Sequence, residues 1–225
     1  MTSYPFSSII FDLDGTLVDT APDLTGALNH VLGLNNLDPV SVQQVRDIVG
    51  YGARITIERG FSHYGIRLDT SALDEAQDQF LAHYAANICK TSTLYPGVQD
   101  VIKEFGHAGI RMGVCTNKTE VLAVDLLTQL GVAPSFATIC GSDTVPNKKP
   151  HPDHVLTALD RMSGEPSTSI LVGDSQADVQ SGQAAGLPVI AMTYGYTAIP
   201  TEALGADVVL DSFADIPKTL EAWVR

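Results

Sequence analysis

Residues 11–20 read FDLDGTLVDT and follow a short apolar run. That run predicts a buried strand over about residues 8–12, and two aspartates, Asp12 and Asp14, stand two positions apart at its end. In an extended chain, side chains two positions apart point to the same side, so both carboxylates can face one cavity. The glycine that follows permits a tight turn, and Thr16 adds a hydroxyl and an amide. One carboxylate can act as a nucleophile and the other as a general acid and base, whereas an Asp-Gly turn alone needs no second aspartate.

A second polar junction lies in GVCTNK, residues 113–118, where a helix is expected directly after a buried strand. The Thr116 hydroxyl, Asn117 and the free amides of a helix N-terminus can bind an anion. The alternative is that these residues only cap the helix. In the loop NKKPHP, residues 147–152, Lys149 can reach a phosphate as a point charge.

A third strand end carries two more carboxylates, in LVGDSQADVQ at residues 171–180. If a helix begins near Ser175, Asp174 and Asp178 both face the tips of the strands. Carboxylate oxygens are hard ligands that suit Mg²⁺. The alternative is an aspartate N-cap with an acidic residue in the first helical turn, which the helix dipole stabilises.

Together, these predicted sites would bring an excess of negative charge into one place. Four aspartates would converge with a phosphate dianion, and each like-charge pair at 4 Å costs about 4 kcal/mol at an effective dielectric constant of 20. A divalent cation, Lys149 and the helix end at Thr116 would supply the positive field that an anion needs. Phosphoryl transfer depends mainly on such positioning and charge stabilisation.

The order of strands and helices predicts an α/β fold. Apolar runs predict strands at about 8–12, 109–116, 169–174, 188–192 and 207–210, and helical periodicity predicts helices near 97–108, 118–131, 152–163 and 176–186. This alternation is typical of a doubly wound, Rossmann-like parallel sheet.

A helical insert interrupts that alternation. Successive helical patterns fill about residues 19–90, which predicts a cap domain there and a core domain made of residues 1–18 and 91–225. The insert leaves the sheet directly after the first strand, so we expect it to lie over the carboxyl ends of the strands, where open α/β sheets bind ligands.

Composition excludes several classes of protein. The chain has 225 residues, 44% of them hydrophobic, and a net charge of −13, which opposes binding to nucleic acid or an anionic membrane. Its three cysteines form no C-x-x-C pair, which argues against a disulfide framework or a thiolate zinc site. We find neither a signal peptide nor an apolar run long enough to span a membrane, and expect a cytoplasmic monomer or homodimer that acts on a small phosphorylated metabolite.

The ordered motifs resemble the haloacid dehalogenase superfamily, and the insert is similar to its type 1 cap. The motifs that carry this resemblance are DLDGT, the strand-end Thr116, Lys149 before Pro150, and GDSQAD. Within the superfamily, the chain resembles the phosphoglycolate phosphatases most, through DLDGTLVDTAPDL, GYGAR, TNK, KKPHP and GADVVLDSFADI. The resemblance covers essentially the whole chain.

The resemblance implies a role for each matching residue. Asp12 would attack phosphorus and become an aspartyl-phosphate, while Asp14 would protonate the leaving oxygen and then activate water. Thr116 and Lys149 would hold the transferring phosphoryl group. Of the two adjacent lysines, we assign this role to Lys149 because it directly precedes the proline.

The implied cofactor is Mg²⁺, held by Asp12, Asp174 and the backbone carbonyl of Asp14, with Asp178 nearby. The implied reaction is hydrolysis of a small phosphomonoester, best matched by 2-phosphoglycolate. One alternative is a phosphosugar mutase of the β-phosphoglucomutase type, which returns the phosphoryl group to an intermediate. Another is a signalling receiver domain, although receivers are shorter and lack the insert.

Two residues of the insert are expected to contact the substrate. Tyr51 and Arg54 lie in GYGAR, residues 50–54, where two glycines interrupt the helical pattern and indicate a loop. The Arg54 guanidinium can bind a substrate carboxylate through two hydrogen bonds, unless it only decorates a solvated helix. Thr16 and Asn117 complete the expected substrate contacts.

Overall fold

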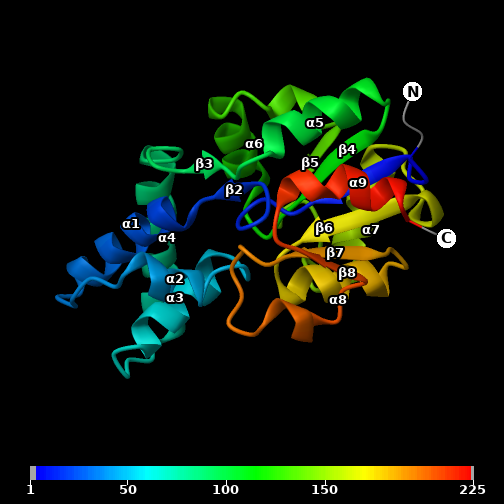
Figure 1. Ribbon diagram of the computed structural model, residues 1–225. Helices are drawn as coiled ribbons and strands as arrows, with labels where there is room; N and C mark the ends of the chain where they lie inside the picture. The colour runs from blue at the N-terminus through cyan, green and yellow to red at the C-terminus, as the bar shows by residue number, and fades with distance from the viewer. Residues whose placement is uncertain (1–3, 224–225) are drawn as a thin grey trace.

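The predicted strands form one parallel sheet in the computed structural model, which describes residues 4–223 (Figure 1). The sheet has six strands in the order β5-β4-β1-β6-β7-β8, so the predicted α/β class is confirmed. The strands are β1 (Ser8–Phe11), β4 (Arg111–Cys115), β5 (Thr138–Cys140), β6 (Ser169–Gly173), β7 (Val189–Met192) and β8 (Val208–Leu210). β1 lies between β4 and β6, with Phe11 opposite Val114 and Val172, so these three strands end side by side.

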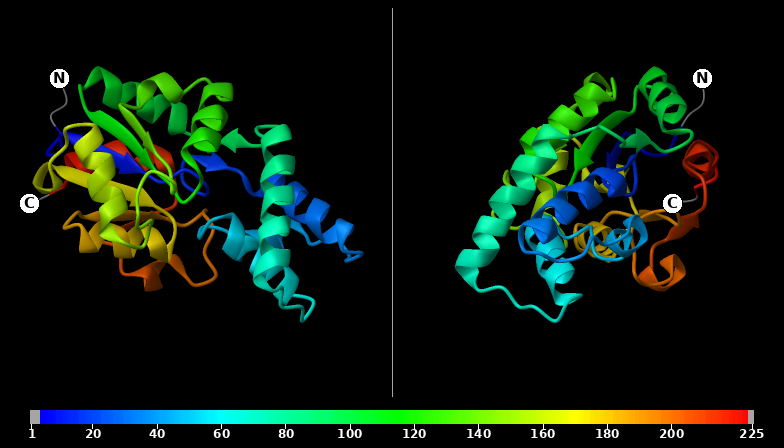
Figure 2. Two further views of the ribbon diagram at one scale, coloured as in Figure 1. Left: turned by 180° about the vertical axis from the view of Figure 1, so that it is seen from behind. Right: turned by 90° about the vertical axis from the view of Figure 1, so that its left-hand side faces the viewer.

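Helices cover both faces of the sheet (Figure 2). They are α5 (Val98–His107), α6 (Glu120–Gln129) and α9 (Ile216–Glu221) on one face, and α7 (Pro152–Arg161) and α8 (Gln176–Ala184) on the other. Ile9 and Phe11 belong to the apolar cluster of the first face, and Ile10 belongs to that of the second. Alternate side chains of β1 therefore enter opposite layers, as the two-residue period of a strand requires.

The structure adds elements that the sequence patterns did not predict. β5 has three residues, too few to show a periodicity, and α9 is also short. The other unpredicted elements are two short strands near residues 18 and 93, described below, and the 3₁₀ helices η1 (Ala133–Ser135), η2 (Pro166–Thr168), η3 (Thr201–Leu204) and η4 (Phe213–Asp215). The helix predicted over about 118–131 begins later, at Glu120, because the chain forms a loop after β4 before it turns into α6.

A group of four helices follows β1 and lies beyond the ends of the strands. These are α1 (Ala21–Leu34), α2 (Val42–Arg46), α3 (Ala53–Ser62) and α4 (Thr70–Ala86). They occupy one end of the molecule, away from α9, which lies toward the other end (Figure 1). The strands β2 (Val18–Asp19) and β3 (Thr93–Leu94) pair antiparallel where the chain enters and leaves this group. No helix within residues 4–223 is both long and apolar enough to span a membrane.

A buried carboxylate fastens the two ends of the four-helix group to each other. Asp23, in the first turn of α1, is 6% exposed. It accepts hydrogen bonds from the backbone amides of Thr91 and Ser92, at 3.0 and 2.9 Å, and from both of their hydroxyls. Burial alone would raise the pKa of Asp23, but these hydrogen bonds outweigh it and lower the pKa.

Asp23→Asn is expected to lower the free energy of unfolding by about 2 kcal/mol, because the new amide group faces donors rather than acceptors. Since the folded-state pKa of Asp23 is lowered, its stabilisation is present above the ordinary value of 3.8 and is lost as the pH falls through the folded-state value. Urea unfolding at pH 7 measures the loss, with Asp78→Asn on the exposed side of α4 as the matched control. Equal stabilities of the two variants would contradict this role.

Candidate active site

The turn after β1 sets the position of the first carboxylates. The amide of Asp12 donates to the Val172 carbonyl at 2.9 Å, which extends the parallel ladder one residue beyond the strand. Gly15 has a φ of +92°, and a Cβ atom there would lie 2.4 Å from Oδ2 of Asp174. Both the backbone conformation and the lack of space therefore require glycine. The close approach brings the β1 turn against the end of β6.

Asp174 is held on all sides at the end of β6. One of its carboxylate oxygens accepts a hydrogen bond from the Thr16 hydroxyl at 2.6 Å, and the other accepts one from the Tyr196 amide at 2.6 Å. A Cβ atom on Gly195 would lie 2.1 Å from Cβ of Asp174, so this side also leaves no room. Asp174 is therefore fixed in a single buried orientation.

Asp178 both caps a helix and takes part in the carboxylate cluster. Its Oδ2 accepts hydrogen bonds from the Ser175 hydroxyl at 2.6 Å and the Ser175 amide at 3.0 Å, which completes a capping box at the start of α8. The N-cap is Ser175, so the alternative of an aspartate N-cap is wrong, although the acidic residue of the first turn, Asp178, does take part in the cap. Its Oδ1 is free for another partner and accepts a hydrogen bond from Lys149 Nζ at 2.6 Å.

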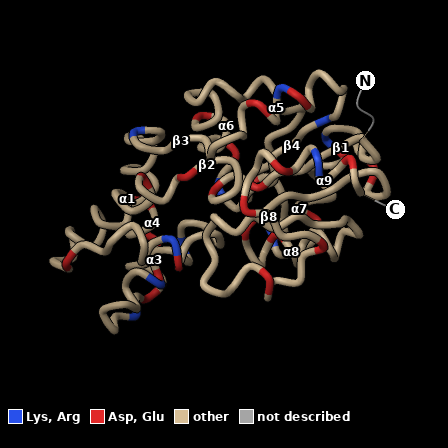
Figure 3. Tube along the Cα trace, viewed as in Figure 1, with Lys and Arg blue, Asp and Glu red and all other residues tan. Residues whose placement is uncertain are grey.

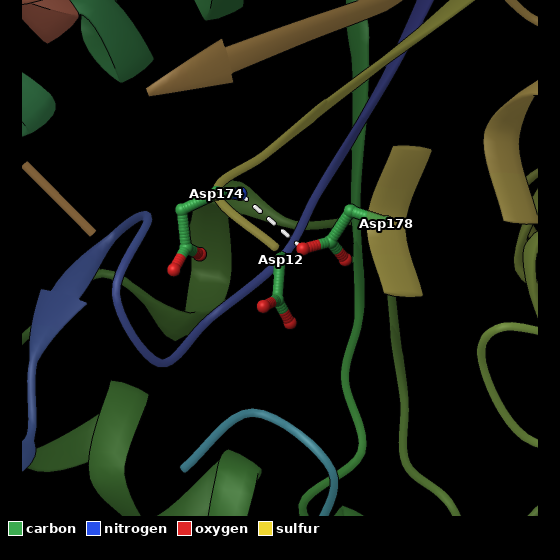
Figure 4. A group of neighbouring side chains, drawn as sticks. All are labelled: Asp12, Asp174 and Asp178. Carbon is green, nitrogen blue, oxygen red and sulfur yellow. Dashed lines mark hydrogen bonds between the residues drawn. The ribbon is translucent and has the colours of Figure 1, made fainter. Parts of the chain in front are cut away.

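Lys149 forms ion pairs with two of the three aspartates. Its Nζ lies 2.8 Å from Oδ1 of Asp12 and 2.6 Å from Oδ1 of Asp178, and its side chain is 2% exposed. Burial would lower the pKa of Lys149, but the two carboxylates outweigh burial and raise it. Figure 4 shows the carboxylates of Asp12, Asp174 and Asp178 turned toward one region, where they offer oxygens within 4.8 Å of one another.

The cluster is short of positive charge. Burial, followed by the charge of Asp178, raises the pKa of Asp12 to about 7 against the opposing effect of Lys149. Burial and then the charge of Asp12 raise the pKa of Asp174 well above its ordinary value. Three carboxylates face one ammonium group, so two negative charges remain unbalanced when all are ionised. These buried oxygens and this excess charge fit a hard divalent cation.

Basic residues are fewer than acidic residues along the chain (Figure 3). Against this background, a second buried lysine faces Asp14. Lys118 Nζ lies 3.0 Å from Oδ2 of Asp14 and donates to the Tyr84 hydroxyl at 3.1 Å. The Thr20 hydroxyl donates to the other oxygen of Asp14 at 2.7 Å. Burial would lower the pKa of Lys118, but Asp14 outweighs it and raises the pKa.

Thr116 and Asn117 lie in the loop between β4 and α6, so the expected helix N-terminus does not form at these residues. The Thr116 hydroxyl accepts a hydrogen bond from the Lys118 amide at 3.2 Å. The Asn117 side-chain amide donates to the carbonyls of Gly50 and Lys149, both at 3.1 Å. Asn117 therefore ties the loop before α3 to the loop that carries Lys149.

A cavity of about 250 Å³ opens where these loops meet the four-helix group. Asp12, Asp14 and Thr116 contribute to its wall from the strand ends, and Phe80 and Tyr84 contribute to it from α4. Its volume lies below the usual range for drug-sized ligands, so it suits a small molecule.

The remaining residues that are expected to contact a substrate differ in whether they line this cavity. Arg54 lines the cavity, but its guanidinium pairs with Asp74 at 2.5 Å. The ring of Tyr51 lies under the Arg59 guanidinium and lines a different hollow. The Thr16 hydroxyl is bonded to Asp174 and is buried away from the cavity.

Sequence reasoning missed several residues of the wall. Lys118 stands in the TNK motif, which could have drawn attention to it, and Lys148 is the neighbour of Lys149. Tyr84 and Phe80 belong to an ordinary amphipathic helix, α4, and no local signal distinguishes them from residues of an apolar core.

Comparison with known proteins agrees with this geometry. The sequence profile of the haloacid dehalogenase-like hydrolases matches residues 9–192. Phosphoglycolate phosphatases from Agrobacterium fabrum and Caulobacter vibrioides are each 42% identical to this chain. These similarities cover 98% and 94% of this chain and 95% and 90% of the two relatives, respectively.

A solved structure gives the same result in three dimensions. It is described as a predicted phosphoglycolate phosphatase from Haemophilus somnus 129PT, and it is 33% identical to this chain with a TM-score of 0.89. The likeness covers 96% of this chain and 98% of that chain, so it includes both the sheet and the four-helix group.

Asp12→Asn is expected to stabilise the metal-free protein at pH 8 by on the order of 2 kcal/mol, because it removes a buried charge. The folded-state pKa of Asp12, about 7, lies above the ordinary value of 3.8. The stability that its bound proton contributes is complete below the ordinary value and is lost as the pH rises through about 7.

Urea unfolding in EDTA at pH 5.5 and pH 8 measures this effect. The wild type should lose more stability between the two values than Asp12→Asn does. The control is Asp78→Asn, which changes an exposed carboxylate. The same pH dependence in all three proteins would show that burial does not raise the pKa of Asp12.

Proposed function

This chain belongs to the haloacid dehalogenase-like hydrolases and is a phosphoric monoester hydrolase, and we propose that its substrate is 2-phosphoglycolate. The observation that carries this proposal is that Asp12 and Asp14, from one turn, line the same small cavity as Thr116. The curated relatives described above are phosphatases by name, which favours hydrolysis over the mutase and receiver alternatives.

In the first step of the proposed reaction, a carboxylate oxygen of Asp12 attacks phosphorus. A bond forms between this oxygen and phosphorus as the bond from phosphorus to the ester oxygen breaks, and Asp14 gives the departing oxygen its proton. Lys149 and Thr116 hold oxygens of the transferring group. The contact of Lys149 Nζ with Asp12, at 2.8 Å, supports this role, because a phosphoryl group on Asp12 would lie beside the ammonium.

In the second step, water hydrolyses the aspartyl-phosphate. Asp14, now ionised, takes a proton from the water, whose oxygen bonds to phosphorus and releases the Asp12 carboxylate and inorganic phosphate. The hydrogen bond from Thr20 and the ion pair with Lys118 hold Asp14 toward the cavity. These two contacts support the role of Asp14, because they fix the position of its carboxylate at the wall of the cavity.

The proposed cofactor is Mg²⁺. Asp12, Asp174 and the backbone carbonyl of Asp14 would hold the ion, with Asp178 at its side, and the Asp14 carboxylate would stay directed at Lys118. When bound, the ion would neutralise the excess negative charge of the cluster and polarise a phosphoryl oxygen. The buried position of all three cluster carboxylates supports this assignment.

We also propose that residues 19–90 act as a cap on a core formed by residues 1–18 and 91–225. The short β2–β3 pair at the junction and the position of α1–α4 beyond the strand ends support this division. Of the four expected substrate contacts Thr16, Tyr51, Arg54 and Asn117, Arg54 and Asn117 line the cavity, and we keep the proposal for these two. We propose a cytoplasmic monomer or homodimer, without nucleic-acid or membrane partners.

Asp12→Asn is expected to abolish Mg²⁺-dependent release of phosphate from 2-phosphoglycolate, because an amide cannot form the acyl-phosphate. Circular dichroism should show an unchanged fold, and Asp78→Asn should keep full turnover. Near-normal turnover by purified Asp12→Asn would disprove the nucleophile assignment.

Asp14→Asn is expected to slow esters with poor leaving groups more than those with good ones. A general acid contributes most when the leaving oxygen is strongly basic, and such catalysis is worth about 10²–10⁴-fold. The test compares kcat for an alkyl phosphate and for p-nitrophenyl phosphate. Equal losses on the two substrates would mean that Asp14 does not act mainly by protonating the leaving group.

A further inference from the structure

Three cations line the cavity, and they differ in whether a carboxylate already neutralises them. Arg54 pairs with Asp74 at 2.5 Å, and Lys118 pairs with Asp14 at 3.0 Å. Lys148 also lines the cavity but forms no ion pair with any of the residues 4–223. A ligand with a negative charge would therefore meet one cation whose charge is still available.

The ammonium group of Lys148 is directed at the loop before α3. Its Nζ donates a hydrogen bond to the backbone carbonyl of Tyr51 at 3.0 Å. It lies so close to Gly52 that a Cβ atom there would be 3.0 Å from Nζ and 3.3 Å from the Asn117 carbonyl. Although Lys148 as a residue is exposed, the packing around its ammonium lowers its pKa. A carboxylate at this point would relieve an uncompensated and partly desolvated charge.

Lys148 is also well placed relative to the reacting groups. It is adjacent in the chain to Lys149, whose Nζ contacts Asp12, so one loop carries both lysines. Asp12 and Lys148 line the same cavity of about 250 Å³. A small substrate whose phosphate is beside Asp12 has its remaining atoms within this space.

We propose that Lys148 is a specificity-determining residue whose ammonium binds the carboxylate of a small substrate that carries a carboxylate besides its phosphate. This inference rests on the proposed function, because it assumes that phosphate is bound next to Asp12. To bind the same carboxylate, Arg54 or Lys118 would first have to give up an acidic partner, whereas Lys148 exchanges only the neutral carbonyl of Tyr51.

The test compares two substrates that differ only at the end remote from phosphorus: 2-phosphoglycolate, and ethyl phosphate, which has two carbons but no carboxylate. Lys148→Met keeps an unbranched side chain only one atom shorter and removes its charge. It should raise KM for 2-phosphoglycolate about tenfold or more with little change in kcat, since a hydrogen bond to a charged group is lost. The kinetics of ethyl phosphate should stay nearly unchanged.

Three further variants make the comparison specific to the charge at this position. Lys148→Arg should restore much of the affinity for 2-phosphoglycolate. Lys148→Glu should shift the preference toward phosphoethanolamine, whose remote end is cationic, beyond the shift that Lys148→Met causes. Lys103→Met removes a lysine from the exposed side of α5 and should change nothing.

Every outcome of this experiment is decisive. Equal losses on both substrates in Lys148→Met would show that Lys148 only holds the loop before α3, and would overturn the inference. Loss of the preference for 2-phosphoglycolate in Arg54→Met, but not in Lys148→Met, would assign the carboxylate to Arg54 instead. A wild type that hydrolyses ethyl phosphate as well as 2-phosphoglycolate would overturn the inference and leave the phosphatase activity intact. A wild type that hydrolyses neither ester would refute the proposed function itself.

Discussion

Three carboxylates are buried together at the edge where β1 and β6 end, and their mutual repulsion is the constraint around which this part of the protein is built. Lys149 is the cation that pairs with Asp12 and Asp178, among the residues that the structure describes. Hydroxyls and backbone amides donate to both oxygens of Asp174 and to Oδ2 of Asp178, which the lysine does not reach. Two glycines leave the space that the Asp174 side chain fills. Burying such a cluster is costly without a counter-ion, and its oxygens fit a divalent cation.

A second ion pair, between Lys118 and Asp14, lines the same cavity as Asp12 and contacts the helices that follow β1. Lys118 connects Asp14 with Tyr84 of α4, and Asn117 connects the loops on either side of the cavity. The carboxylates therefore come from the turns at the strand ends, while the four-helix group completes the wall of the cavity.

The sequence predicted those features that depend on local pattern. Strand-end aspartates and the alternation of strands and helices are visible in the chain, because burial of a parallel strand and the turn after it dictate residue types within a few positions. The wall of the cavity is not local. Tyr84 reaches Lys118 only because α4 folds back over the strand ends, and the Tyr51 ring packs under Arg59 instead of facing the cavity. Lys148 and Lys149 look alike in sequence, and only the path of their loop separates the lysine that faces Asp12 from the one that faces Tyr51.

The central claim is that the phosphoryl group passes through Asp12, and the most direct measurement is chemical identification of the phosphorylated residue. The protein is mixed with 2-phosphoglycolate and Mg²⁺, quenched in acid during turnover and treated with borohydride, which reduces an aspartyl-phosphate to homoserine. Mass spectrometry of the peptides then locates the modification. We expect homoserine at position 12, and only when substrate is present. Homoserine at another aspartate, or turnover with no modified aspartate at any quench time, would contradict it.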